Sequence, residues 1–174
     1  MRLFKLAPVS SAPRLLVRTM TQIVVTWTFA LVVLPILAVS IDNELGLDSW
    51  QQPVTTAVGA LCLVASSTLG LCAAWEMVTR GEGTPLPTEA ARRLVVTGPY
   101  RWVRNPMAIG GVGQSLGVAL MVGSWIALLI PLAGAVVWST WMRPAEERFL
   151  VATFGADYLR YRERVGLWVP RPNR

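Results

Sequence analysis

Four long apolar stretches constrain the fold of this chain more than any other feature of the sequence. They cover residues 20–41, 54–78, 107–122 and 124–142, in a chain of 174 residues of which 53% are hydrophobic. A helix needs about 20 apolar residues to cross a hydrocarbon core about 30 Å thick. The sequence therefore predicts an all-α integral membrane protein, with about four transmembrane helices in a single domain.

The positions of the basic residues predict how the chain is oriented. Arg and Lys gather before residue 20, in the polar insert 79–106 and after residue 142. The loop after the first stretch carries Asp42, Glu44 and Asp48 and no basic residue. By the positive-inside rule, both termini and the insert are expected on the cytoplasmic side. The first stretch lacks a small-residue cleavage pattern, so no cleavable signal peptide is predicted.

The composition argues against several classes of function. A net charge of +6 is explained by the positive-inside bias and by anionic lipid headgroups, so no nucleic-acid partner is expected. The chain has no histidine, and its two cysteines, Cys62 and Cys72, lie inside an apolar stretch. Neither a metal site nor a disulfide framework is predicted.

The third and fourth apolar stretches are predicted to form a helical hairpin. Only a turn at Gly123 separates them, so the two helices must run antiparallel and side by side. The third is expected to begin at Pro106, which suits a first helical turn, and the fourth to end near Arg143 and Pro144. The cytoplasmic ends of both helices would then meet.

This convergence places two polar pairs together. Arg104 and Asn105 precede the third helix, and Glu146 and Glu147 follow the fourth, so the four side chains are predicted to be neighbours. Residues after the hairpin alternate aromatic and charged positions at helical spacing, which predicts an interfacial amphipathic helix with a kink at Gly155.

The four side chains have a chemistry that suits a zwitterionic ligand. Arg104 offers a planar fork of donors and Asn105 an amide donor, so together they could bind an acid group. The glutamates could accept from an ammonium or from ribose hydroxyls, and S-adenosylmethionine has all of these groups. The same residues are also common as topology signals and interfacial salt bridges, and this alternative stays open.

Glycines recur at helical spacing on the third predicted helix, at 110, 113 and 117. Such a stripe of small residues lets helices approach closely in lipid. The alternative is that a ligand lies against Gly110, where a missing side chain leaves room.

Two motifs resemble the isoprenylcysteine carboxyl methyltransferase family and related phospholipid methyltransferases. The first is LVVTGPYRWVRNP at residues 94–106, and the second is the glutamate pair followed by FGADYLRY at residues 154–161. The resemblance covers residues 92–164. It implies a small bacterial-type member, an integral membrane methyltransferase with S-adenosyl-L-methionine as cofactor and its site on the cytoplasmic face.

The resemblance also implies roles for individual residues. It places Arg143 toward the acceptor, and Glu147 is the carboxylate that could assist proton transfer. The expected cofactor-binding residues, to which the residue chemistry adds Arg104 and Gly110, are Arg92, Arg93, Leu94, Val95, Tyr100, Arg104, Asn105, Pro106, Gly110 and Glu146. Two positions depart from the family pattern: Asn105 stands where histidine is usual, and Ala108 where tyrosine is usual.

The acceptor is expected to be an amphiphile with an apolar tail. Methyl transfer mainly requires in-line positioning and exclusion of water. With no histidine, a carboxylate or thiol of a prenyl or lipid-like compound is favoured, because it can react already deprotonated. The alternatives are a phospholipid-type amine, a small thiol, and a non-catalytic membrane sensor or scaffold. Residues 1–78 are expected to anchor the chain, and residues 79–174 to hold the cofactor loop, hairpin and C-terminal segment.

Overall fold

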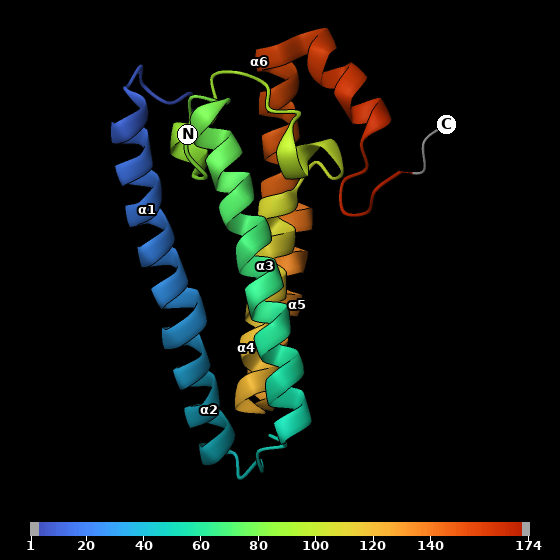
Figure 1. Cartoon of the computed structure of the whole chain (residues 1–174). Helices are drawn as coiled ribbons and strands as arrows, with labels where there is room; N and C mark the ends of the chain where they lie inside the picture. The colour runs from blue at the N-terminus through green and yellow to red at the C-terminus, as the bar shows by residue number, and fades with distance from the viewer. Residues whose placement is uncertain (1–3, 172–174) are drawn as a thin grey trace.

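The computed structural model describes residues 4–171, and this part of the chain is helical, with isolated bridges at Leu6–Ala90 and Val103–Gly166 and no β-strand. The longer helices form a bundle of elongated rods (Figure 1). They are α1 (Ala12–Thr28), α2 (Leu34–Glu44), α3 (Pro53–Thr79), α4 (Pro106–Val122), α5 (Trp125–Val137) and α6 (Arg143–Arg164). The short helical turns are η1 (Phe29–Val33), η2 (Pro87–Glu89), η3 (Gly98–Arg101) and η4 (Trp138–Met142).

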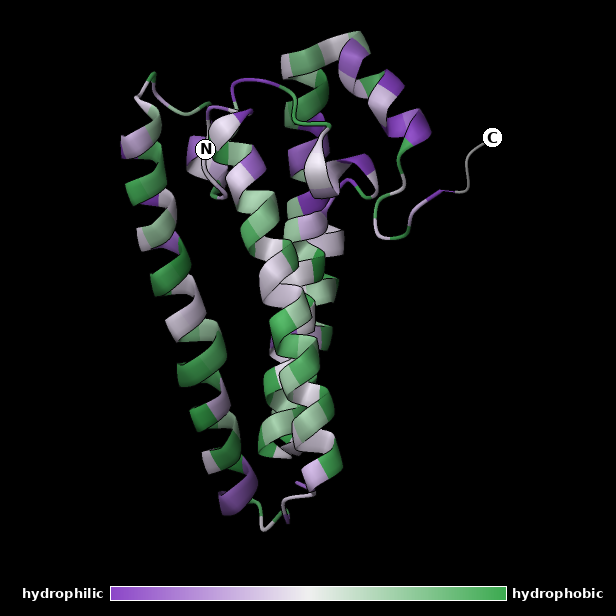
Figure 2. Cartoon of the chain, in the orientation of Figure 1, coloured by the Kyte–Doolittle hydropathy of each residue, from purple (hydrophilic) through white to green (hydrophobic). Residues whose placement is uncertain are grey.

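Three of these rods are long and apolar enough to cross a membrane, among the residues that the structure describes. They are Ala12–Glu44, Pro53–Thr79 and Trp125–Arg164. The all-α membrane fold is therefore confirmed. The predicted count of four spans is not, because α4 is apolar but has only 17 residues. Figure 2 shows hydrophobic residues along the middle of the rods and hydrophilic residues gathered at their ends.

The hairpin of α4 and α5 forms as the sequence predicts. Helix α4 begins at Pro106 and ends at Val122, and the residue that caps it, Gly123, has a left-handed φ of 62° that suits glycine. The side chain of Ser124 then accepts a hydrogen bond from the backbone N–H of Ala127 at 3.0 Å and caps α5. Two residues thus reverse the chain.

The predicted end of the fourth helix near Arg143 and Pro144 is wrong. The rod continues from α5 through η4 into α6, without a break at the proline. Segment η4 is a turn of π-helix, in which the backbone N–H of Arg143 donates to the carbonyl of Trp138. Pro144 then stands in the first turn of α6, where a missing N–H is tolerated. The predicted kink at Gly155 is present, with φ 53° and ψ −127°.

Helices α3 and α4 pack closely through their small residues. A Cβ added to Gly117 would lie 2.7 Å from the carbonyl oxygen of Gly59. One added to Gly110 would lie 3.1 Å from the carbonyl oxygen of Ser66 and 3.3 Å from the Cα of Gly70. The stripe of small residues therefore serves close helix packing, as in other membrane bundles.

The polar insert 79–106 is held by the chain's own N-terminal segment. The backbone N–H of Lys5 donates to the carbonyl of Pro87 at 2.9 Å, and that of Ala90 donates back to Lys5 at 2.8 Å. Phe4 stacks on Phe149 of α6, with ring centroids 5.7 Å apart. The N-terminal segment, the insert and the bent part of α6 thus gather at one end of the bundle (Figure 1).

Candidate functional site

A cluster of ionised side chains lies where α4 begins and α6 begins. Glu147 is its centre: one carboxylate oxygen accepts from Arg104, from Arg143 at 3.1 Å and from the hydroxyl of Tyr158 at 3.2 Å. The predicted approach of Arg104 to the glutamate pair is therefore confirmed. The arrangement follows from the hairpin, which returns α6 to the start of α4.

Tyr158 joins the cluster, although the sequence reasoning did not select it. Its hydroxyl accepts from Arg104 at 3.0 Å and from Arg143 at 2.9 Å, and its side chain is almost fully buried. The kink at Gly155 turns the second half of α6 so that Tyr158 reaches these partners. The kink was predictable from the glycine, but its direction was not.

Glu146 balances the charge of the cluster. It accepts from Nη1 of Arg143 at 2.7 Å, and its side chain is about one-quarter exposed. Two buried arginines, Arg104 and Arg143, thus face two glutamates, and the more exposed Arg162 also pairs with Glu147, at 3.7 Å. Removing one member of a buried ion pair leaves an uncompensated charge, so the four residues depend on one another.

Two buried donors beside these ion pairs have no hydrogen-bond partner among the described residues. They are Nδ2 of Asn105 and Nε of Arg143, and both side chains are at least nine-tenths buried. A buried donor without an acceptor costs about 1–3 kcal/mol, so native proteins rarely leave one without reason. Asn105 also stands at the N-terminus of α4, where the helix dipole favours negative charge. The pair fits an anionic or strongly accepting ligand group.

An apolar floor adjoins the ion pairs. Tyr100 and Val95 pack with Ala73 in a buried cluster, with Met77 and Met107 against it. The hydroxyl of Tyr161 donates to the backbone carbonyl of Tyr100 at 2.6 Å and so connects this floor to α6. Burial raises the pKa of Tyr100 far above its ordinary value, so its phenol stays neutral.

Glu76 positions the turn that leads into the site. Its carboxylate accepts from the hydroxyl of Thr97 and pairs with Nε of Arg80 at 2.9 Å. Gly98 has a φ of 56°, and a Cβ there would lie 2.6 Å from Cγ of Glu76. The sequence reasoning missed Glu76, although an acidic residue near the end of an apolar helix is a signal in itself.

Other predicted site residues lie apart from the ion pairs. Arg92 donates to the backbone carbonyl of Ala7 at 2.9 Å, and Arg93 pairs with Glu82 at 2.9 Å. Their contacts thus hold the insert and the N-terminal segment together. Leu94 is half-buried next to Val95, and Pro106 is buried at the start of α4.

Gly110 is covered by α3, whose backbone at Ser66 occupies the space a ligand was expected to fill. In this structure helix packing accounts for Gly110.

Comparisons with known proteins point to one family. A family model described as phospholipid methyltransferase matches residues 54–157. The protein-S-isoprenylcysteine O-methyltransferase of Saccharomyces cerevisiae is 31% identical over 84 residues, which are 47% of this chain and 34% of that protein. The protein of the same name from Schizosaccharomyces pombe is 30% identical over 125 residues, 67% of this chain and 49% of that protein. The chain thus spans half or less of the length of these relatives.

Proposed function

We propose that the chain, which belongs to the phospholipid methyltransferase family, transfers a methyl group from S-adenosyl-L-methionine to an amphiphilic acceptor within the membrane. The observation that carries the proposal is the pair of unpartnered buried donors on Asn105 and Arg143, beside the ion pairs centred on Glu147. If Asn105 and Arg143 served only the structure, the protein would be more stable with a hydrogen-bond partner for each of the two donors.

The residues present fit the cofactor. Asn105 and Arg143 would donate to its carboxylate, and the partly exposed carboxylate of Glu146 would accept from its ammonium or its ribose hydroxyls. The sulfonium of the bound cofactor would supply the activated methyl group. Tyr100 and Val95 would form the apolar wall that excludes water from the reacting groups.

Arg104 has a different role in this proposal from the one expected of it. Its guanidinium is about nine-tenths buried and donates to Glu147, to Tyr158 and, through Nε, to the backbone carbonyl of Val165 at 2.9 Å. Arg104 thus positions α6 against the start of α4, and it leaves the binding of the cofactor carboxylate to Asn105 and Arg143.

The acceptor that we propose is a carboxylate or thiol of a prenyl or lipid-like compound. Glu147 accepts from two guanidinium groups and a hydroxyl, so it is poorly placed to take a proton from an acceptor. Tyr100 is a neutral phenol, and the sequence has no histidine. An acceptor that reacts already deprotonated needs no base. The names of the yeast relatives agree with a prenylated carboxylate.

A second candidate acceptor is the amine of a phospholipid headgroup, which the description of the family favours. The two candidates differ in the bond that is formed. A carboxyl methyl ester releases methanol in base, whereas an N-methyl amine does not.

The experiment that tests this proposal is transfer of labelled methyl from S-adenosylmethionine by the purified protein. The acceptors are an N-acetyl S-prenyl cysteine and a phosphatidylethanolamine, each in mixed micelles. We expect base-labile label in the prenyl cysteine, and loss of transfer in Asn105→Ala. Base-stable label in the phospholipid alone would select the amine reaction. If neither acceptor is methylated while the cofactor still binds, the result would contradict the proposed methyl transfer and would favour a membrane sensor.

We further propose that both termini and this site lie on the cytoplasmic side of a bacterial cytoplasmic membrane. The N-terminal segment, the insert and α6, which carry most of the basic residues, gather at one end of the bundle (Figures 1 and 2). This is the arrangement that the positive-inside rule describes.

A further inference from the structure

A short segment near the N-terminus connects the two elements that carry the candidate site. Residues 4–7, called here the N-terminal strap, run beside the insert, and Leu6 forms a parallel bridge with Ala90. The same strap reaches α6, where Phe4 stacks on Phe149. The strap therefore joins the insert to the helix that carries the glutamate pair.

Hydrogen bonds hold the strap to the insert. The backbone N–H of Ala7 donates to the carbonyl of Ala90 at 2.9 Å, in addition to the two backbone bonds that Lys5 makes with the insert. Nη1 of Arg92 donates to the carbonyl of Ala7, also at 2.9 Å. Because Ala7 is fully buried, water cannot replace these bonds unless the strap moves away.

Aromatic packing holds the strap to α6. Phe4 is buried, and its ring centroid lies 5.7 Å from that of Phe149, with 28° between the ring planes. Aromatic pairs favour stacked geometries at such distances. Phe149 lies two residues after Glu147, on the part of α6 that precedes the kink at Gly155. The strap thus contacts α6 close to the centre of the candidate site.

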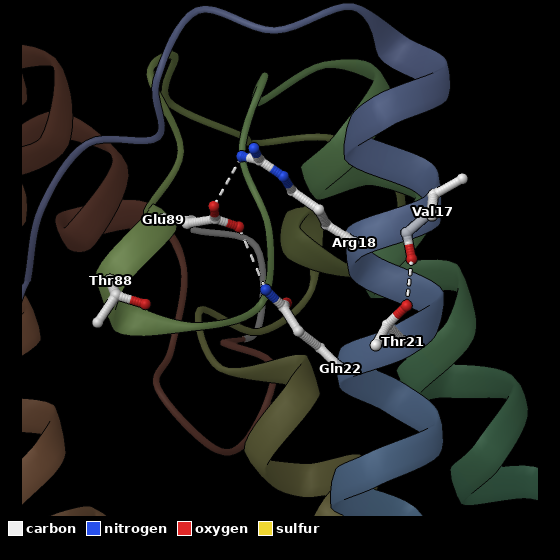
Figure 3. A pocket seen from close by; sticks show the side chains of 6 residues that line it. All are labelled: Val17, Arg18, Thr21, Gln22, Thr88 and Glu89. Atoms are coloured by element: carbon white, nitrogen blue, oxygen red, sulfur yellow. Dashed lines mark hydrogen bonds and ion pairs between the residues drawn. The ribbon is translucent and has the colours of Figure 1, made fainter.

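Helix α1 holds the same part of the insert from another side. Nη1 of Arg18 pairs with Glu89 at 2.8 Å, and Nε2 of Gln22 donates to the same carboxylate at 3.2 Å. Figure 3 shows both side chains of α1 pointing toward Glu89, at a groove between α1 and the insert. Glu89 is the neighbour of Ala90, so the strap and α1 fix one short stretch of the insert.

The second half of α6 is attached to the end of the insert. After the kink at Gly155, the hydroxyl of Tyr161 donates to the carbonyl of Tyr100, and Nε of Arg104 donates to the carbonyl of Val165. Before the kink, the strap makes the connection. Helix α6 is therefore attached to the insert on both sides of its kink, once directly and once through the strap.

We propose that Phe4 is a positioning residue for the methyl-transfer reaction: its stack on Phe149 holds the insert at the distance from α6 at which the cofactor binds. The insert carries Val95 of the apolar wall and the donor of Asn105. A misplacement of about 1 Å in such groups can lower a rate about a hundredfold. The inference rests on the function proposed above. It gives Arg92 an indirect role, through the strap, in place of the direct cofactor contact that the family resemblance implies.

Calorimetric binding of S-adenosylmethionine to the purified full chain tests the role of Phe4. We expect Phe4→Ala to bind about fivefold more weakly, because the stack is lost, and Phe4→Tyr, which keeps the ring, to bind like wild type. Gly117→Ala is the control for stability, because it disturbs the packing of α3 on α4 and touches neither the strap nor the insert. If Gly117→Ala weakens binding as much as Phe4→Ala, the effect is one of general stability and the proposal is wrong.

A double-mutant cycle tests whether the stack itself carries the effect. Phe149→Ala should weaken cofactor binding about as much as Phe4→Ala, and the double variant should bind no more weakly than either single variant, because both changes remove one contact. Additive losses would mean that the two rings act separately, and they would overturn the assignment.

Arg92→Met tests the attachment of the strap to the insert. This change removes the donor to the carbonyl of Ala7 and keeps an unbranched apolar side chain. If Arg92 acts through the strap, the losses of binding in Arg92→Met and Phe4→Ala should combine to less than their sum. Full additivity would indicate a direct contact of Arg92 with the cofactor and would contradict the role of the strap.

The same measurements separate this inference from the proposed function. If folded wild-type protein does not bind S-adenosylmethionine, the proposed function is wrong, and this inference is wrong with it. If wild-type protein binds the cofactor and Phe4→Ala binds it equally well, the proposed function stands and only the role of Phe4 is wrong.

Discussion

Tyr158 is the residue that joins the two helix ends at the candidate site. Its hydroxyl contacts Arg104, Arg143 and Glu147, which come from opposite sides of the hairpin. The approach of Arg104 to Glu147 could be predicted from sequence, because a two-residue turn fixes where helices meet. Tyr158 could not, because its position depends on the direction of the Gly155 kink. Glu76 stands out in the sequence as an acidic residue near the end of an apolar helix, but its contact with Thr97 depends on the left-handed turn at Gly98.

We predict that Tyr158→Phe destabilises the protein by about 1–3 kcal/mol, because the buried charged groups of Arg104, Arg143 and Glu147 each lose one hydrogen bond. The change should appear as a lower Tm in detergent. Thr140→Val is the matched control, since the Thr140 hydroxyl donates only to the carbonyl of Val136 in its own helix. An equal loss in both variants would mean that the Tyr158 hydroxyl has no special role.

At the scale of elements, the packing of α3 on α4 depends on glycine at the point of closest approach. A methyl group at Gly117 would lie within 3 Å of the backbone at Gly59 and Leu63, which cannot move without separating the helices. We predict that Gly117→Ala lowers the Tm by several degrees. Gly111→Ala, on the same helix with no atom within 4 Å of the added methyl, should not. Similar behaviour of the two variants would contradict this account.

The elements also show where sequence patterns mislead. Pro106 begins α4 as predicted, because a proline in a first turn breaks no hydrogen bond. The sequence predicts a helix end near Arg143 and Pro144, where the fourth apolar stretch stops. The π-helical turn η4 precedes α6 and places Pro144 in the first turn of α6, so the rod continues. No local signal in the sequence distinguishes these two outcomes.

At the scale of the whole molecule, one end of the bundle holds the insert, the N-terminal segment and the bent part of α6 (Figure 1). Hydropathy and charge were sufficient to predict this polar end and the membrane fold. Of the about four spans that they predicted, three are confirmed as long and apolar enough, and the fourth is not, because α4 has only 17 residues.

Orientation is tested by labelling single cysteines in a variant without Cys62 and Cys72. We predict that Asp48→Cys, in the loop without basic residues, reacts with a membrane-impermeant maleimide in intact bacterial cells. Glu82→Cys, in the insert, should react only after the membrane is opened. The reverse pattern would place the candidate site on the outer side and contradict the proposed topology.

The measurement that tests the central claim most directly is calorimetric binding of S-adenosylmethionine to the purified protein and to Asn105→Ala. The account predicts that the wild-type protein binds and that the variant binds about tenfold more weakly, because one charge-assisted hydrogen bond is lost. Asn43→Ala should bind like wild type, because Asn43 is exposed in the last turn of α2, and this end of α2 lies at the opposite end of the bundle (Figure 1). Absence of binding by folded wild-type protein, or unchanged binding by Asn105→Ala, would contradict the account.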